Sequence, residues 1–258
     1  HRFYDVIGFQ RSVTRRNLGF VPKMIRSTRQ AIQDLRASRP AVVVSVGGYA
    51  SVPSVLAARR LKVPVVVVSY DRTPGQASRL SARRAAACAV AFENSPLQRA
   101  EVTGAPVRQA ILDVDRETGR AAARAHLGLP DDRFVVAILG GSQGSGILNG
   151  AVADYLQQHS DDGQLAVRQV AGDRFLDGTD QVGTGALDGT GVLHQLVGYE
   201  DEMPLVYAAV DLLVGRGGAS TVHEVAVTGT PAILVPWLNA TDDHQTGNVE
   251  WLSEQGGA

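Results

Sequence analysis

The chain has 258 residues, 44% of them hydrophobic, with 28 glycines and a formal net charge of −1. This length suits one large domain or two ordinary ones, and the composition is typical of a globular α/β protein. The single cysteine, Cys88, excludes an internal disulfide framework and fits a reducing compartment. The longest apolar run, residues 63–68, has the length of a strand, far below the roughly 18 residues that cross a bilayer.

Charge is divided unevenly along the sequence. Residues 1–112 contain 18 Lys and Arg against 5 Asp and Glu, whereas residues 113–258 contain 7 against 21. The difference indicates two domains with different partners, although chance variation between domains gives the same pattern. A basic half is suited to anionic lipid, nucleic acid or a phosphorylated substrate. Nucleic acid is disfavoured, because the basic half has no aromatic interleaving and no recognisable binding motif.

Helical and strand patterns alternate along the chain. After a basic, irregular stretch at residues 1–20, the expected helices are residues 21–38, 53–60, 116–127, 147–158, 203–209, a helix from 220, and 243–255. The expected strands are residues 41–46, 63–69, 134–139, 165–170, 193–197, 211–214 and 232–235, and the alternation continues through residues 82–91. This order is typical of βαβ units and parallel sheets. We therefore predict an α/β fold with two Rossmann-like, doubly wound domains facing a cleft.

Two segments are expected to be connections. Gly104–Asp115, which contains Pro106, is predicted to link an N-terminal domain at residues 1–108 to a C-terminal domain at residues 109–258. Residues 172–191 are rich in Gly and Asp and are expected to form a loop. The sequence starts at His1 rather than at Met and stops within an expected domain, so we expect a fragment that lacks segments at both ends.

Ligands of doubly wound folds bind outside the carboxyl ends of the strands, which singles out four loops. The first is Gly140-Gly141-Ser142-Gln143-Gly144, between a strand and a helix. Its glycines let backbone N–H groups approach an anion, and Ser142 can donate to a phosphate oxygen. The loop is not a Walker motif, because no Gly-Lys-Ser/Thr follows, and a tight turn that binds nothing fits the residues equally well.

The second loop is Gly215-Arg216-Gly217-Gly218-Ala219-Ser220-Thr221, which again opens a helix. Helix-start amides suit a diphosphate, and the nearby Glu224 carboxylate can accept both hydroxyls of a ribose. Thr221 and Glu224 also have the spacing of a capping box, in which the glutamate only closes the helix start. The residues by themselves slightly favour the cap.

The remaining two loops are polar or glycine-rich. In residues 239–248, Asp242 and Asp243 are good N-caps, and Gln245 and Asn248 share a helix face from which they can bind sugar hydroxyls, although an ordinary polar helix start has the same composition. His244 lacks a second ligand at suitable spacing, so no metal site is predicted. Gly47-Gly48-Tyr49 follows a buried strand and allows close approach by a substrate. Arg108 at the domain junction either reaches into the cleft or anchors the linker.

Five motifs occur in a recognisable order: Gly47-Gly48-Tyr49-x-Ser51-x-Pro53, Gly104-x-Pro106-Val107-Arg108, Gly140-Gly141-Ser142-Gln143-Gly144 with Leu148-Asn149, Arg216-x-Gly218-Ala219-x-Thr221-x-x-Glu224, and Asp243-His244-Gln245-x-x-Asn248. Together they resemble the MurG family of peptidoglycan N-acetylglucosaminyltransferases, from about residue 20 to the end. The resemblance implies a GT-B fold and inverting transfer of N-acetylglucosamine from its UDP derivative, without cofactor or metal. It implies as acceptor the 4-hydroxyl of the muramic acid of an undecaprenyl-pyrophosphate-linked precursor.

The resemblance also implies roles for individual residues. Ser142, with Gln143 beside it, and Ala219, Ser220 and Thr221 hold the diphosphate; Glu224 takes the ribose, Gln245 with Asn248 the sugar, Arg108 the donor, and the backbone near Glu200 the uracil. Gly47, Gly48 and Tyr49 lie toward the acceptor. The expected location is peripheral, on the cytoplasmic face of the plasma membrane, with an anionic membrane surface as partner and roles in cell-wall biogenesis, cell shape and cell division.

The chain departs from the family pattern at two points. The family's His-Glu-Gln-Asn after the second strand is replaced by Val68-Ser69-Tyr70-Asp71. The histidine often proposed as general base belongs to a glycine-rich loop expected before His1, so the base is expected outside the chain, with Asp71 as the alternative. Two other functions remain open: another UDP-sugar enzyme of this architecture, such as a glycolipid synthase or an epimerase, and a non-catalytic UDP-sugar-binding subunit.

Overall fold

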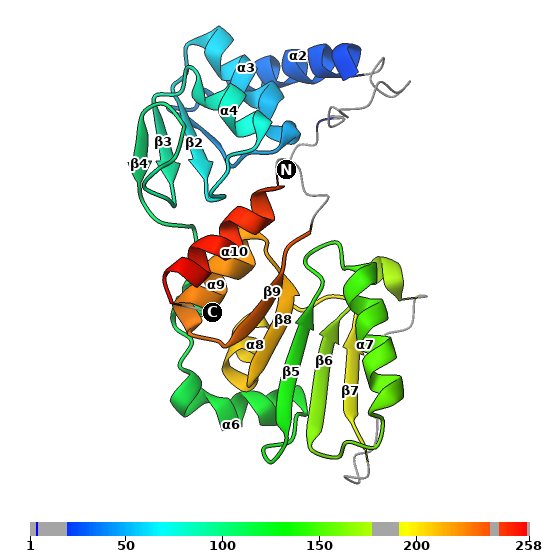
Figure 1. The fold of residues 1–258 in the computed structure, drawn as a ribbon. Coiled ribbons are helices and arrows are strands. Elements are labelled where there is room, and N and C mark those ends of the chain that lie inside the picture. Colours follow the sequence, from blue (N-terminus) through cyan, green and yellow to red (C-terminus); the bar gives the residue numbers. More distant parts are fainter. Residues whose placement is uncertain (1–3, 5–19, 177–190, 238–242, 257–258) are drawn as a thin grey trace. The chain divides into compact units, whose positions relative to one another are not determined.

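Two parallel sheets, one in each half of the chain, organise the structure, which is a computed structural model (Figure 1). It describes residues 4, 20–176, 191–237 and 243–256. The chain divides into two compact units, His1–Pro106 and Val107–Ala258. All pairings between neighbouring strands in the described residues are parallel, which confirms the predicted α/β class with two Rossmann-like units.

The first unit contains a four-stranded sheet of order β1-β2-β3-β4. Its strands are β1 (Val43–Ser45), β2 (Val65–Ser69), β3 (Ala87–Val90) and β4 (Ala100–Val102), and its helices are α2 (Phe20–Ser38), α3 (Val52–Leu61) and α4 (Gln76–Ala82), with a 3₁₀ turn η1 (Tyr49–Ser51). Val55, Val65, Val67 and Val90 form its buried core. The sequence did not predict β4, because all three of its residues are exposed and it therefore carries no apolar pattern.

The second unit contains a five-stranded sheet of order β7-β6-β5-β8-β9. Its strands are β5 (Phe134–Leu139), β6 (Leu165–Val170), β7 (Leu193–Val197), β8 (Leu212–Arg216) and β9 (Ala232–Val235). Its helices are α5 (Gln109–Leu112), α6 (Arg116–Leu127), α7 (Gly146–Gln158), α8 (Met203–Ala209), α9 (Ala219–Thr228) and α10 (His244–Glu254), with a 3₁₀ turn η2 (Asp173–Phe175). β5 lies centrally, and the chain leaves it toward β6 on one side before returning to β8 on the other.

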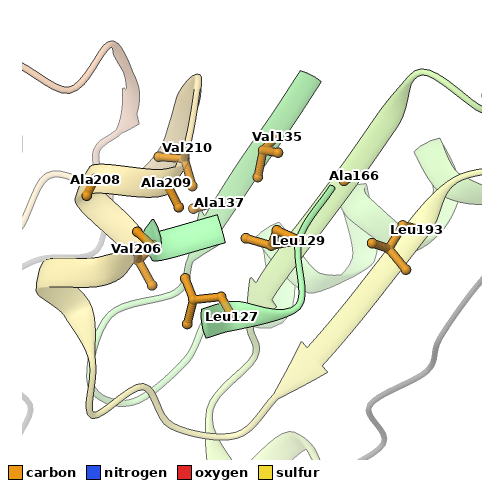
Figure 2. Packing of buried hydrophobic residues seen from close by; sticks show 11 residues of the cluster. Leu127, Leu129, Val135, Ala137, Ala166, Leu193, Val206, Ala208, Ala209 and Val210 are labelled. Atoms are coloured by element: carbon orange, nitrogen blue, oxygen red, sulfur yellow. The ribbon is translucent and has the colours of Figure 1, made fainter. Parts of the chain in front are cut away.

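The central strand β5 is packed on both faces. Val135 and Ala137 lie in a cluster with Leu193 of β7 and residues of α6 and α8, among them Leu127 and Val206 (Figure 2). The alternate residue Ile138 joins a second cluster that includes Leu148 of α7. Burial on both faces gives a parallel strand a continuous apolar sequence, which is why residues 134–139 were predicted with correct bounds.

A buried arginine lies at the end of this sheet where β5 and β8 begin, and it binds residues that precede both strands. Arg124 of α6 is 1% exposed and its Nη2 lies 2.7 Å from Asp211 Oδ2. Its Nε donates to Ala209 O at 2.8 Å and its Nη1 to Asp131 O at 2.9 Å. Asp211 also accepts from Val135 N at 2.7 Å and pairs with Arg120. The charge pair is thus fully hydrogen-bonded, the condition under which a buried ion pair is tolerated.

Several expected boundaries differ from those of the structure by one or two residues, and two of the differences bear on the site. Gly104–Asp115 is not a bare linker, since Gln109–Leu112 forms the helical turn α5. The strand predicted at residues 211–214 begins at Leu212 and continues through Arg216, so Gly215 and Arg216 belong to β8 rather than to the loop after it. Most of residues 172–191, and most of the basic stretch 1–20, lie outside the described residues. Among the described helices, none has both the length and the apolar character to span a bilayer.

We predict that Asp211→Asn lowers the free energy of unfolding of the second unit by about 3–5 kcal/mol at pH 7, because it leaves the Arg124 charge buried without its partner. Arg120→Gln is the control: its side chain is 40% exposed, and its loss should cost at most about 1 kcal/mol. Urea unfolding of the three proteins measures both. Equal losses in the two variants would contradict the assignment of the buried pair.

The same pair has a defined pH dependence. Burial raises the pKa of Asp211, but the hydrogen bond from Val135 N and the contacts with Arg120 outweigh it and hold the pKa below the ordinary 3.8. A carboxyl with a depressed folded pKa contributes stability above its ordinary pKa and loses it as the pH falls through the folded value. The difference between wild type and Asp211→Asn should therefore shrink below about pH 4.

Candidate functional site

The strand order of the second unit defines where a ligand is expected. β5 pairs with both β6 and β8, and the chain reverses its winding direction between β5 and β8, whose carboxyl ends meet at the pair Leu139–Gly215. Ligands of open parallel sheets bind outside the carboxyl ends of the strands at such a reversal. The first and second predicted loops follow these two strands, so both lie at the expected position.

The first loop ends in a helix start that is already capped. The N-cap of α7 is Ser145, whose Oγ accepts from Leu148 N at 3.3 Å. Ser142 and Gln143 are exposed in the turn before it. Ser142 was predicted to bind a ligand, whereas the cap at Ser145 was not predicted, although serine immediately before an apolar helical pattern is a standard capping signal.

Arg216 connects three strand ends. Its Nη2 and Nε donate to Ser145 Oγ at 2.7 and 3.2 Å, which joins the end of β8 to the loop after β5. Its Nη1 donates to Val235 O at 3.3 Å and Pro236 O at 3.4 Å, at the end of β9. The guanidinium of Arg216 therefore connects the loop after β5 to the ends of β8 and β9. The motif containing Arg216 was noted in the sequence, but this role was not.

Gly144 is required by a close approach of two loops. Its φ is +66°, and a Cβ at this position would overlap Ala171 O and lie 2.9 Å from Gly172 Cα, in the segment after β6. The left-handed conformation favours glycine, and the contact leaves no room for a side chain. The turn after β5 is thereby held against the end of β6.

A buried polar chain fixes the segment that Gly144 contacts. Asn149 Nδ2 donates to Ala171 O at 3.1 Å, and Asn149 Oδ1 accepts from Gln169 Nε2 at 3.0 Å. Gln169 Oε1 lies 2.9 Å from His194 Nε2, which must be the donor because an amide oxygen only accepts. Burial lowers the pKa of His194, which favours the neutral ring. Sequence reasoning noted Asn149 only within a motif and missed the other two.

The second loop ends in a helix start that no side chain caps. The N-cap of α9 is Gly218, with no side-chain hydrogen bond, and the helix begins at Ala219. The capping-box interpretation of Thr221 and Glu224 is therefore wrong, because Thr221 already lies inside the first turn. The backbone N–H groups at Ala219, Ser220 and Thr221 are the ones that a helix cannot satisfy internally, and the helix dipole adds positive potential.

Glu224 lies on α9 behind this helix start and is held from two sides. Tyr207 of α8, fully buried, donates its hydroxyl to Glu224 Oε2 at 2.8 Å. Burial, and next the charge of Glu224 and this hydrogen bond, raises the pKa of Tyr207 far above its ordinary value, so it remains a donor. Arg108 Nη2 lies 4.0 Å from Glu224 Oε1. Arg108 was expected at the end of the first domain and belongs to the second unit.

The third loop is braced from α10. Gln245 Oε1 accepts from Trp237 N at 2.9 Å, and Asn248 Nδ2 donates to Gly217 O at 3.4 Å. Asn248 is fully buried, so the predicted direct contact with a sugar is not supported, and it lies behind the loop instead. Asp243 occupies the N-cap position, but its Oδ1 accepts from Thr246 Oγ1 and makes no cap bond to the backbone. Asn239 and Asp242 lie outside the described residues.

The side chain of Glu200 is occupied by the protein. Its Oε2 accepts from Arg168 Nε at 2.8 Å and its Oε1 from Glu202 N at 2.9 Å, and the residue is 8% exposed. Only its backbone remains for a ligand, which is the role the sequence analysis gave to this position.

The residues expected on the acceptor side lie in the first unit. Gly47 and Gly48 have φ of +87° and +71° after β1, and a Cβ on Gly47 would lie 2.9 Å from Ser78 Oγ. Tyr49 begins η1 and its ring packs edge-on against Phe20 of α2. Asp71 follows β2 and is partly buried. Gly47, Gly48 and Asp71 thus follow the carboxyl ends of neighbouring strands, as predicted for loops that meet a substrate.

An apolar hollow of the second unit lies elsewhere. It has a volume of about 500 Å³ between α7 and the face of β5, β6 and β8, with Phe134, Val136 and Tyr155 among its lining residues. Phe134 begins β5, so the hollow extends toward the amino ends of the strands, and it lacks the convergent polar groups of a ligand site. We therefore locate the candidate site at the loops after β5, β8 and β9. Within the described ranges, no group of three or more His, Cys, Asp and Glu side chains is placed to hold a metal.

Comparisons with known proteins agree with this fold. The N-terminal-domain model of glycosyltransferase family 28 matches residues 2–90, and the C-terminal-domain model matches residues 135–258. The crystal structure of Acinetobacter baumannii MurG is 28% identical, with a TM-score of 0.64 over 92% of this chain and 64% of that chain. A structure of S. aureus MnaA with UDP has a TM-score of 0.60 over 92% of this chain and 74% of that chain, at 12% identity, a likeness of fold alone.

Curated relatives match the chain at higher sequence identity than these structures do. Proteins named UDP-N-acetylglucosamine--N-acetylmuramyl-(pentapeptide) pyrophosphoryl-undecaprenol N-acetylglucosamine transferase from Nocardioides sp. and Salinibacter ruber are 40% and 36% identical over 92% and 97% of this chain. The chain spans 64% and 66% of their lengths. The two units thus have the GT-B architecture. The chain belongs to glycosyltransferase family 28, and the resemblance to MurG inferred from the motifs is confirmed.

We predict that Gly144→Ala lowers the free energy of unfolding by about 1–3 kcal/mol, because the left-handed backbone and the contact with Ala171 O leave no place for a methyl group. Gly150→Ala is the matched control: a Cβ there meets nothing within 4 Å on the exposed side of α7, and it should raise stability by roughly 0.5–1 kcal/mol. Denaturant unfolding measures both. Similar effects of the two substitutions would refute the packing of Gly144 against Ala171.

Proposed function

We propose that the whole protein transfers N-acetylglucosamine from UDP-N-acetylglucosamine, with inversion, to the 4-hydroxyl of an undecaprenyl-pyrophosphate-linked muramyl pentapeptide. The names of relatives at 36–40% identity support this activity. The observation that carries the proposal is the uncapped start of α9 at the winding reversal of the sheet, with Glu224 held behind it by Tyr207. This reaction belongs to peptidoglycan synthesis, and through it to cell shape and division.

The diphosphate of the donor would bind at the start of α9. The backbone N–H groups of Ala219, Ser220 and Thr221 would face its oxygens, and the exposed Ser142 and Gln143 would approach from the loop after β5. Bond cleavage between the anomeric carbon and the diphosphate leaves additional negative charge on the leaving group. Preorganised backbone amides stabilise such charge where it develops. One hydrogen bond from such an amide contributes on the order of 3 kcal/mol to the stabilisation of the transition state.

The nucleoside would be recognised next to this position. Glu224 can accept from ribose hydroxyls, and Tyr207 sets the direction of its carboxylate by binding Oε2, 2.8 Å away. Arg108, with its side chain 58% exposed and 4.0 Å from Glu224, would supply positive charge to the donor. The backbone at Glu200 would face the uracil, since its side chain is held by Arg168.

The sugar and the acceptor complete the proposed site. Gln245, whose Oε1 is taken by Trp237 N, would donate its Nε2 hydrogens to a sugar hydroxyl, with Asn248 positioning the loop behind it. Gly47, Gly48 and Tyr49 would lie toward the polyprenyl-linked acceptor. The acceptor oxygen forms its bond to the anomeric carbon as the bond to UDP breaks, and its proton passes to a base; Asp71 is the candidate within this chain.

We predict that Glu224→Ala in the full-length protein weakens UDP binding by roughly ten- to 100-fold, because hydrogen bonds to a charged group contribute about 1.5–3 kcal/mol. It should also abolish the preference of the wild type for UDP over 2′,3′-dideoxy-UDP. Tyr207→Phe should weaken this preference while retaining part of it, because the carboxylate remains but is less well oriented. Calorimetric titration with both nucleotides measures the preference.

Glu250→Ala serves as the control, because Glu250 is an exposed carboxylate of the same unit on α10. Its binding and its nucleotide preference should equal those of the wild type. Transfer of radiolabelled sugar to the lipid-linked acceptor then tests the reaction itself. Binding of the donor without any transfer would overturn the proposed activity in favour of a binding subunit, and conversion of the donor without acceptor would favour an epimerase.

We also propose that the protein is peripheral to the cytoplasmic face of the plasma membrane, through the first unit. Its helix α2 exposes Val21 (59%) and Ile25 (47%) beside Arg26 and Arg29. Apolar residues flanked by arginines on one helix are suited to the interface of an anionic bilayer, where each well-placed basic residue contributes roughly 1 kcal/mol.

We therefore predict that the protein co-sediments with vesicles containing phosphatidylglycerol and that its binding falls as salt increases. Arg26→Gln/Arg29→Gln should weaken this binding by on the order of tenfold or more, from the loss of roughly 2 kcal/mol of attraction. Neutral phosphatidylcholine vesicles are the control. Binding that is absent, or that salt does not change, would remove this part of the proposal.

A further inference from the structure

A pocket of the first unit collects positive charge at the end of the sheet opposite to the acceptor-side loops. It has a volume of about 410 Å³, and its lining includes Arg59, Lys62, Arg84 and Arg99. The remaining lining residues, Val63, Pro64, Val65, Ala85 and Ala86, lead into β2 and β3, and Arg99 precedes β4. The pocket therefore lies at the amino ends of three strands, whereas Gly47, Gly48 and Asp71 follow the carboxyl ends of β1 and β2.

Among the residues that the structure describes, no acidic side chain balances the positive charge of this pocket. No lining residue is acidic, and none of the four basic residues forms an ion pair in the part of the chain that the structure describes. The helices α3 and α4 end nearby, at Leu61 and Ala82, and each helix end carries about half a negative charge. About one negative charge thus faces four positive ones.

The walls of the pocket are anchored, but hydrogen-bond donors remain. Arg59 Nη2 donates to Leu80 O and Ser81 O at 3.0 and 2.8 Å, while its Nε is buried with no partner in the described residues. Arg99 Nη1 donates to Ala85 O at 2.6 Å. Lys62 and Arg84 are exposed at the rim. Burial, and next the charge of Arg84, lowers the pKa of Arg59, as expected for cations gathered without a counter-ion.

We propose that this pocket binds a phosphate group. Guanidinium groups donate pairs of parallel hydrogen bonds to phosphate oxygens, and the lysine adds a mobile point charge. Inorganic phosphate, a soluble phosphate ester and a phospholipid headgroup share this chemistry. The site is distinct from the proposed donor and acceptor sites and does not depend on the proposed transfer reaction.

Titration of the full chain with inorganic phosphate and with glycerol 1-phosphate, at constant ionic strength in sodium chloride, tests the proposal. We expect calorimetric binding with a Kd on the order of 1 mM or tighter. Lys62→Gln/Arg84→Gln should weaken it at least tenfold. These two exposed residues are chosen because Arg59 supports the end of α4, so that its replacement risks unfolding. Arg60→Gln, the same charge on the same helix but outside the lining, should bind as the wild type does.

Binding to vesicles distinguishes a phospholipid headgroup from a soluble phosphate ester as the ligand of the pocket. If the double variant loses binding to phosphatidylglycerol vesicles and glycerol 1-phosphate displaces the wild type from them, the ligand is a lipid headgroup. If both proteins bind vesicles equally while only the wild type binds the soluble ester, the ligand is a soluble phosphate. Either result supports the site. The proposal is overturned if the wild type shows no phosphate binding up to about 20 mM, or if the double variant binds phosphate equally well.

Discussion

Ser145 makes the two similar loops of the second unit differ, because it caps α7 and also accepts from Arg216, whereas α9 has no side-chain cap. Ser145 Oγ accepts from Arg216 Nη2 at 2.7 Å and from Leu148 N at 3.3 Å, so one backbone amide of the first turn of α7 already has a side-chain partner. The start of α9 has Gly218 at its N-cap and no side-chain bond. Both loops are glycine-rich turns between a strand and a helix, yet only the second leaves its first-turn amides uncapped. This difference is why we propose the start of α9, rather than that of α7, as the position for an anion.

The loop after β5 is also held in position by the segment that follows β6. Gly144 packs against Ala171 O, which Asn149 holds in turn, and Gln169 and His194 continue the chain of hydrogen bonds into the sheet. Such a network stabilises one geometry only when every member is satisfied. Because the donors all point in one direction, from His194 toward Ala171, each amide has a single consistent orientation.

The sequence predicted the fold where burial imposes a pattern and failed where contacts are distant. Strands β5, β6, β7 and β9 have the predicted bounds. For β5 the reason is burial on both faces, which gives a continuous apolar run. Strand β4 is exposed and gave no signal. The Thr221–Glu224 spacing favoured a capping box, but the helix begins earlier, and Glu224 is bound by Tyr207 from another helix. No local pattern distinguishes the buried Asn248 from an exposed amide.

The acidic character of the second unit strengthens the case for backbone amides. Residues 113–258 contain seven Lys and Arg, all arginines, and each donates to an acceptor of the protein: Arg116, Arg120, Arg124, Arg133, Arg168, Arg174 and Arg216. Each of these arginines is therefore already partly committed to the protein. Arg108 differs, with a side chain 58% exposed and a contact with Glu224 of 4.0 Å. We therefore propose that an anion in this unit binds to the first turn of α9, with the exposed Arg108 as a nearby positive charge.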